Sequence, residues 1–145
     1  MIALLQRVTQ AAVHVNNEQI AQIDKGLLVF IGVEPFDDHD KATRLLDKIL
    51  RYRVFADEQD KMNRCLLDIE GGLLLVPQFT LAANTNKGLR PSFSTAAPPQ
   101  QGNELFTELL HMAEQRYPST CAGQFGSDMQ VSLINDGPVT FWLQI

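Results

Sequence analysis

The sequence Gly-Leu-Leu-Val-Phe-Ile-Gly-Val at residues 26–33 decides the fold class. It is a nearly continuous apolar run of strand length, which predicts a β-strand that is buried on both faces. An amphipathic helix is predicted directly after it. Asp37, Asp38 and Asp40 supply acidic residues that favour a helix N-terminus. The residues that follow have helical spacing and form one apolar stripe: Ala42, Leu45, Leu46, Ile49 and Leu50.

Strand-like segments dominate on both sides of this unit. They are Met1–Thr9, Ala11–Val15, Gln19–Ile23, Tyr52–Phe55, Cys65–Ile69, Gly72–Val76, Met129–Asn135 and Pro138–Ile145. A second helix begins after Pro98-Pro99 and ends before Pro118. Two main helices and many strands predict one α/β (α+β) domain over residues 1–145, with a mixed, mostly antiparallel sheet or a partly closed β-barrel. Asp136-Gly137 is a candidate hairpin turn.

The composition is that of a soluble globular protein, with 145 residues of which 45% are hydrophobic and 20% charged. No apolar run approaches the ~20 residues of a membrane-spanning helix, and Met1–Gln10 shows no secretory signal pattern. Cys65 and Cys121 form no CxxC pair. Reduced thiols are therefore favoured over a disulfide, and a cytoplasmic location is expected.

The net charge of −5 argues against a protein that coats a nucleic-acid backbone, because such binding depends on Lys and Arg. It remains compatible with contact at one end of an RNA. The cations available for such a contact are Lys87, Arg90, Arg7, Arg51 and Arg53.

Familiar catalytic motifs are absent. His14, His39 and His111 are the only histidines, and none neighbours a serine or cysteine in a nucleophile motif. The sequence contains no HExxH, EF-hand loop, P-loop or GxGxxG. The carboxylate pair Asp37-Asp38 is better explained as a helix cap than as an acid/base dyad. No cofactor and no catalytic metal are expected.

The first candidate for the chemistry is Pro77-Gln-Phe-Thr-Leu81, where a predicted strand opens into a long polar loop. Gln78 offers an amide and Thr80 a hydroxyl. The backbone N–H groups of Phe79 and Thr80 are suited to stabilise an oxyanion. Taken alone, the segment is explained more simply as a strand end with satisfied turn hydrogen bonds.

Two further segments are candidates for binding. Asn135-Asp-Gly-Pro-Val-Thr140 contains a Gly–Pro bond, which adopts the cis form at modest cost and would then hold two carbonyls side by side for an ammonium group. Lys87-Gly-Leu-Arg-Pro-Ser-Phe93 places two cations and an aromatic in one loop, which suits a phosphate or a nucleotide base. Taken alone, they are explained more simply as an ordinary turn and a solvated loop.

Six segments together are far more specific than any one of them. They are MIALLQRVT (Met1–Thr9), GLLV (Gly26–Val29), QFTL (Gln78–Leu81), KGLRPSF (Lys87–Phe93), QVSL (Gln130–Leu133) and NDGPVTFWL (Asn135–Leu143). In order and spacing they resemble the D-aminoacyl-tRNA deacylase family over essentially the whole chain.

The resemblance implies a homodimer with its active site at the subunit interface. It implies hydrolysis of the ester that joins a D-amino acid, or glycine, to the 3′-terminal adenosine of tRNA. The ester would lie against Gln78, Phe79 and Thr80. The residues implied in chiral selection are Gly137, Pro138, Arg7 and Met129, with Gly137 and Pro138 reaching in from the other subunit and Arg7 bracing them. Lys87 and Arg90 would contact the tRNA.

Two catalytic roles are open for this segment. Thr80 as a nucleophile would be weak, because no base lies next to it in the sequence. Alternatively, the terminal ribose 2′-hydroxyl helps to activate water, and the protein contributes position and oxyanion stabilisation. The lack of an identifiable base favours the second role.

One position departs from the family, which usually has serine where this chain has Pro77. Proline removes a hydroxyl and a backbone N–H donor. A related tRNA-deacylase branch with relaxed chirality is similar in having proline there, but it differs at Phe79 and at Gly137–Thr140. The D-aminoacyl interpretation is therefore kept. Its rivals are a non-catalytic module that binds RNA ends or metabolites, and an esterase or peptidase for D-amino acids that ignores RNA.

Overall fold

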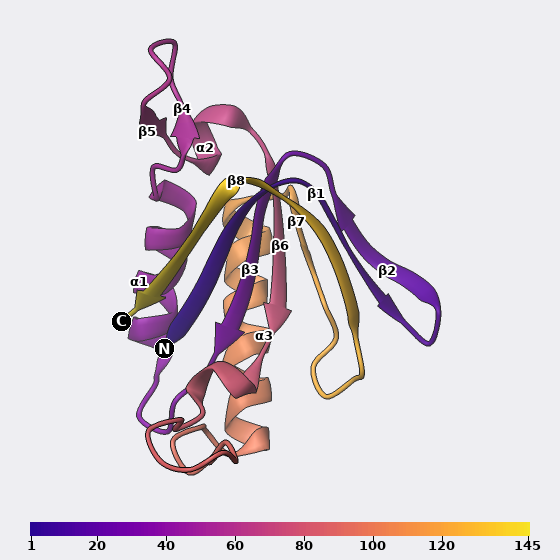
Figure 1. Cartoon of the computed structure of the whole chain (residues 1–145), viewed down its shortest axis with the longest axis vertical. Helices are drawn as coiled ribbons and strands as arrows, with labels where there is room; N and C mark the ends of the chain where they lie inside the picture. Colours follow the sequence, from indigo (N-terminus) through magenta and orange to yellow (C-terminus); the bar gives the residue numbers. More distant parts are fainter.

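The computed structural model describes residues 1–145 as a strongly bent sheet with two long helices beside it (Figure 1). The main sheet has the strand order β2 (Glu18–Ile23), β1 (Ile2–Val15), β3 (Gly26–Gly32), β6 (Gly72–Pro77) and β7 (Thr120–Ala122), and β8 (Gln130–Gln144) also pairs with β1. The β3–β6 and β6–β7 pairs are parallel, and the three pairs that β1 makes are antiparallel. The predicted mixed sheet is confirmed.

β1 is a long strand whose two halves have different neighbours. Ile2–Val8 pairs with β3, whereas Ala11–Val15 pairs with β2 along the same edge. β8 follows β1 along its other edge from end to end. Because the neighbour changes at the bend, β1 and β8 arch over one end of the molecule and descend as two arms (Figure 1). This arch makes the sheet barrel-like.

The main core lies between the sheet and the helices α1 (His39–Arg51) and α3 (Pro99–Arg116), which were both predicted. β3 is buried on both faces, as predicted. Leu27, Val29 and Ile31 belong to the main core, whereas Leu28 belongs to a smaller cluster under the curled half of β1. No helix is long and apolar enough to cross a membrane.

The acidic residues before α1 have separate roles. Asp38 is the N-cap and accepts a bond from the backbone N–H of Lys41 at 2.9 Å. Asp37 is a buried carboxylate that accepts a bond from the N-terminal ammonium group of Met1 at 2.7 Å. That ammonium group also donates to Glu34 Oε2 at 2.9 Å. The start of β1 is thereby tied to the loop between β3 and α1.

Several details differ from the sequence prediction. Cys65–Ile69 is not a strand: it forms the short helix α2 (Leu66–Ile69), because Asp68 accepts the backbone N–H of Cys65 at 2.7 Å and caps the turn. Asp136-Gly137 is not a hairpin turn, since β8 continues through it. A small hairpin of β4 (Phe55–Ala56) and β5 (Met62–Arg64) projects beyond α1 (Figure 1). β7 had no distinct sequence pattern.

Candidate active site at the end of strand β6

The Pro77–Leu81 segment lies where β6 ends. Pro77 has no N–H, and the backbone N–H of Gln78 instead donates to Ile31 O of β3 at 2.7 Å. The chain then turns into the 3₁₀ helix η1 (Phe79–Ala82). The first N–H groups of a helix have no acceptor within it. Phe79 and Thr80 therefore begin η1 with backbone donors that the helix does not use.

The side chains of Gln78 and Thr80 contact each other. Gln78 Nε2 donates to Thr80 Oγ1 at 2.5 Å. An amide N–H can hold the hydroxyl in place but cannot accept its proton. The only side-chain hydrogen bond of Thr80 is the one from Gln78, so no carboxylate or imidazole is in place to act as the base that would convert it into a nucleophile.

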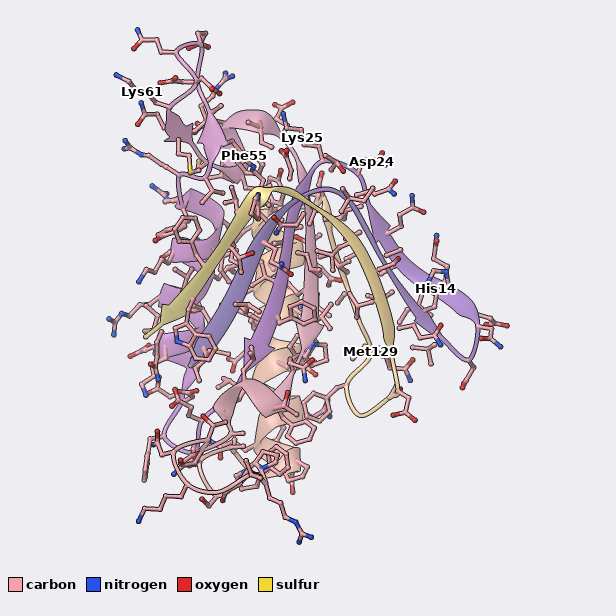
Figure 2. The ribbon with its side chains drawn as sticks, viewed as in Figure 1. His14, Asp24, Lys25, Phe55, Lys61 and Met129 are labelled. Atoms are coloured by element: carbon pink, nitrogen blue, oxygen red, sulfur yellow. The ribbon has the colours of Figure 1, made fainter.

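A cavity of about 480 Å³ lies directly beside this segment. Pro77, Gln78 and Phe79 line it, and so does Met129, which directly precedes β8. Figure 2 shows Met129 at the end of the β8 arm, next to this part of the sheet. α3 and the loop before β8 add Pro99, Gly102, Phe106, Phe125, Gly126, Ser127 and Asp128. The remaining lining residues are all apolar: Ile31, Val33, Val76, Ala97 and Val131.

The polar loop after η1 folds back over the same end of the molecule. Asn84 and Ser92 exchange two backbone hydrogen bonds, at 2.7 and 3.1 Å, and close the base of the loop. The Phe79 and Phe93 rings pack with their centroids 5.0 Å apart. Lys87 and Arg90, at the tip, are exposed and form no ion pair. Two free cations therefore lie beside the strand end.

Gly137 and Pro138 lie at the bend of β8 and are joined by a cis peptide bond. Arg7 holds the residue before them, donating from Nε to Asp136 O at 2.9 Å. The same guanidinium donates from Nη1 to Val54 O at 2.7 Å. Arg7 thus ties the Gly137–Pro138 bend to the segment that leads into β4.

Within one chain, these two segments lie at opposite ends of β3. Arg7, which contacts the bend of β8, is paired with Leu27, whereas Gln78 is bonded to Ile31. Four residues of strand separate the two points by about 13 Å. Figure 2 shows Phe55 and Met129, which lie near the two ends of the sheet, well apart. One chain alone does not bring Gln78–Thr80 and Gly137–Pro138 into one site.

Residues 4–144 match the family described as D-Tyr-tRNA(Tyr) deacylase. The chain belongs to this family. It is 60% identical to the D-aminoacyl-tRNA deacylase of Pseudomonas aeruginosa (strain LESB58) over 144 residues, which is 99% of each chain. It is also 60% identical to the enzyme of that name from Pseudomonas putida over 145 residues, covering all of both chains.

Two solved structures have the same fold over nearly the whole chain. A structure described as c-Myc DNA Unwinding Element Binding Protein superposes with a TM-score of 0.95 and 37% identity, covering 100% of this chain and 99% of the other. A structure described as a probable eukaryotic D-amino acid tRNA deacylase superposes with a TM-score of 0.88 and 18% identity, over 99% and 98% of the two chains. The second likeness concerns the fold.

The histidines of this deacylase lie away from the strand end. His39 Nδ1 contacts Glu108 Oε1 at 2.5 Å across the outer faces of α1 and α3. His111 contacts Gln115 on α3 at 2.9 Å. His14 lies on the far arm of β1 (Figure 2). None of these contacts forms a catalytic triad.

The shifted pKa values also lie elsewhere. Backbone N–H bonds, from Lys61 to Asp57 and from Cys65 to Asp68, lower the pKa of the two carboxyl groups. Burial raises the pKa of the Tyr117 hydroxyl and of the Cys121 thiol. Cys65 and Cys121 form no disulfide. None of the groups with a shifted pKa therefore belongs to the Pro77–Leu81 segment at the end of β6.

Sequence patterns missed the far wall of the cavity. Phe125, Gly126, Ser127 and Asp128 form it, in the loop between β7 and β8. An aromatic followed by Gly-Ser-Asp reads as an ordinary turn. This loop lines the cavity only because the fold brings the start of β8 close to the end of β6, which the sequence does not indicate. Among the predicted residues, Gln78, Phe79 and Met129 line the cavity, and Thr80 lies next to it on η1.

Proposed function

We propose that this deacylase hydrolyses the ester of D-aminoacyl-tRNA as a homodimer in which each site contains segments of both subunits. The observation that carries the proposal is the placement of Gln78–Thr80 and Gly137–Pro138 at opposite ends of β3. A two-fold axis that passes between the two segments would place each segment of one subunit beside the other segment of its partner. Such a dimer would complete two sites at once.

The outer edge of β8 supports this assembly. β8 pairs only with β1, which leaves its other edge unpaired over 15 residues. Ile134 and Trp142 of β8 are each 52% exposed, and Phe79 is 55% exposed. Long exposed edges and large apolar side chains are usually covered in native proteins. A second copy of the chain would cover them.

In the proposed site, the ester carbonyl lies against the start of η1. The backbone N–H groups of Phe79 and Thr80 stabilise the oxyanion that forms when water adds to the carbonyl carbon. The bond from that carbon to the 3′-oxygen then breaks, and the oxygen leaves with a proton as the ribose 3′-hydroxyl. The neighbouring 2′-hydroxyl orients the water, accepts its proton and passes its own proton to the departing 3′-oxygen, since Thr80 contacts only the Gln78 amide.

Selection against L-amino acids is assigned to backbone rather than to a side-chain pocket. The carbonyls around the partner subunit's Gly137 and the partner subunit's Pro138 accept the α-ammonium group. They leave no room for a side chain on the L side of the α-carbon. A wall of this kind rejects one isomer while accepting many D side chains. Glycine, which has no side chain, is accepted too.

The cavity and the polar loop suit the rest of the substrate. The half-buried Phe125 ring packs on the buried Phe106 ring, with centroids 6.5 Å apart, and contributes aromatic surface that fits an adenine or an amino-acid side chain. Lys87 and Arg90 are placed to meet phosphates of the acceptor end. Two local cations on a chain of net charge −5 fit contact with one end of tRNA. Action on charged tRNA places the enzyme in the cytoplasm.

One assay tests the proposal. D-Tyr-tRNA, L-Tyr-tRNA and D-Tyr ethyl ester are offered to the pure protein, and release of tyrosine is measured. The expected result is rapid hydrolysis of D-Tyr-tRNA, with little action on the other two substrates. Comparable hydrolysis of the ethyl ester would identify an esterase that ignores RNA. Saturable binding of D-Tyr-tRNA without release of tyrosine would identify a binding module.

A further inference from the structure

The side chain of Asn135 replaces a missing piece of the β1–β8 ladder. The pairing passes from Gln6 opposite Thr140 to Val8 opposite Asn135, so four residues of β8, from 136 to 139, bulge opposite one residue of β1. Val139 is 6% exposed and has no partner in that ladder. Its backbone needs both a donor and an acceptor, because unpaired buried groups are costly.

Asn135 supplies both groups with one amide. Its Oδ1 accepts the N–H of Val139 at 2.8 Å, and its Nδ2 donates to Val139 O at 3.1 Å. The same Nδ2 also donates to Thr140 Oγ1 at 3.2 Å. Only an amide of this length offers a donor and an acceptor at adjacent positions. An aspartate would keep the acceptor, lose the donor and place an oxygen against Val139 O.

The bulge is therefore held at both ends. Arg7 binds Asp136 O at its entry, at 2.9 Å, and Asn135 binds Val139 at its exit. No side chain hydrogen-bonds to Gly137 or Pro138 between these two points. The direction of the Gly137 and Pro138 carbonyls is thus set by Arg7 and Asn135, which bind the residues on either side of them.

We infer that Asn135 is a positioning residue for stereochemical selection, because its amide fixes the Gly137–Pro138 backbone that faces the substrate α-carbon in the partner's site. The inference rests on the proposed function. A steric wall rejects an isomer only while it stays within a few tenths of an ångström of its place. Without the Asn135 clamp the wall moves, while Gln78–Thr80 remains intact.

The test compares Asn135→Asp with the wild type. The kcat/KM values for D-Tyr-tRNA and L-Tyr-tRNA are measured, and their ratio is the readout. The ratio is expected to fall at least about tenfold in Asn135→Asp, because small displacements cost large factors in rate. Asn103→Asp is the matched control, since Asn103 is exposed on α3 and makes no side-chain hydrogen bond; it should keep the wild-type ratio.

A ratio within about twofold of the wild type in folded Asn135→Asp overturns the inference, because it corresponds to a negligible change in selection. Folding is checked by urea denaturation. If Asn135→Asp does not fold, Thr140→Val decides, because it removes from an exposed residue the hydroxyl that accepts from Asn135 Nδ2 and from Gln6 Nε2. A reduced ratio in that variant supports the clamp, and an unchanged ratio overturns it. A wild type that shows no preference for D-Tyr-tRNA contradicts the proposed function instead.

Discussion

The amide of Gln78 donates a hydrogen bond to the hydroxyl of Thr80 at 2.5 Å. This contact determines what Thr80 can do. A hydroxyl that a donor holds, with no base beside it, is poorly suited to attack an ester. Catalysis is then assigned to backbone donors and to the substrate's own ribose.

The first prediction concerns Thr80→Val, which removes the hydroxyl and keeps the shape. We expect the variant to keep kcat for D-Tyr-tRNA within about tenfold, since loss of a true nucleophile costs about 10⁴-fold or more. Wild-type enzyme given D-Tyr-tRNA with a 2′-deoxy terminal adenosine should lose about 10²-fold or more, the usual contribution of general acid–base help. Single-turnover rates measure both effects. If a folded Thr80→Val variant still binds substrate but has no turnover, the Thr80 hydroxyl is the nucleophile and the substrate-assisted mechanism is wrong.

The second prediction concerns the backbone N–H of Phe79. Phe79→Pro removes this donor at the first residue of η1, where proline is well tolerated. We expect kcat to fall about 10²-fold or more, which is the effect of losing one oxyanion donor. Phe79→Ala is the control, because it removes the ring and keeps the N–H. Equal losses in the two variants would show that the ring matters and the donor does not.

The third prediction concerns the cations of the loop. In Lys87→Glu/Arg90→Glu, KM for D-Tyr-tRNA should rise about tenfold at moderate salt and become less dependent on salt, because phosphate contacts are lost. The value of kcat at saturating D-Tyr-tRNA should not change. Arg44→Glu/Lys48→Glu, on the exposed face of α1, is the charge-matched control. An equal rise of KM in the control would indicate a general charge effect rather than a local contact.

The fourth prediction concerns stability. In Asp37→Asn, the buried ammonium group of Met1 loses the nearer of its two carboxylate partners, at 2.7 Å, and keeps Glu34 at 2.9 Å. Breaking one side of a buried ion pair costs about 3 kcal/mol of unfolding free energy. Urea denaturation measures the loss. The exposed Asp40→Asn should change stability by less than about 0.5 kcal/mol. Similar midpoints for both variants would show that the pair contributes little.

The strand at Gly26–Gly32 and the helices α1 and α3 were predictable because their signals are local. Burial on both faces gives a continuous apolar run, and burial on one face of a helix gives a stripe. The Cys65–Ile69 segment was wrongly predicted as a strand, because its apolar residues are compatible with a strand or a helix. The hydrogen bond from the Cys65 N–H to Asp68 stabilises the helix. Asp37 was predicted to cap a helix. In the structure it binds the ammonium group of Met1, which is 36 residues away in the sequence, so no local pattern indicates the contact.

The sequence indicated which segments form the site, but not where these segments lie relative to one another in the fold. The Gln78–Leu81 and Asn135–Thr140 segments stood out through a resemblance carried by sequence letters. That they lie at opposite ends of β3 depends on pairings between residues distant along the chain, namely Arg7 with Leu27 and Gln78 with Ile31. Local periodicity contains no information about which strand ends meet.

The central claim is that Gly137–Pro138 of one subunit completes the ester site of the other. Two variants that each lose activity test it. Phe79→Pro removes the oxyanion donor. Gly137→Ala places a Cβ 2.4 Å from the backbone nitrogen of Val139, which displaces the bend and its carbonyls. The two variants are unfolded, mixed in equal amounts and refolded together, and D-Tyr-tRNA hydrolysis is measured.

If sites are shared, half of the dimers contain both variants, and each of these has one site with both wild-type segments. We therefore expect recovery of about a quarter of wild-type activity. If both segments of a site came from one chain, no mixed dimer would contain an intact site. Activity of the mixture no greater than the mean of the two separate variants, with mixed dimers present, would contradict the shared site.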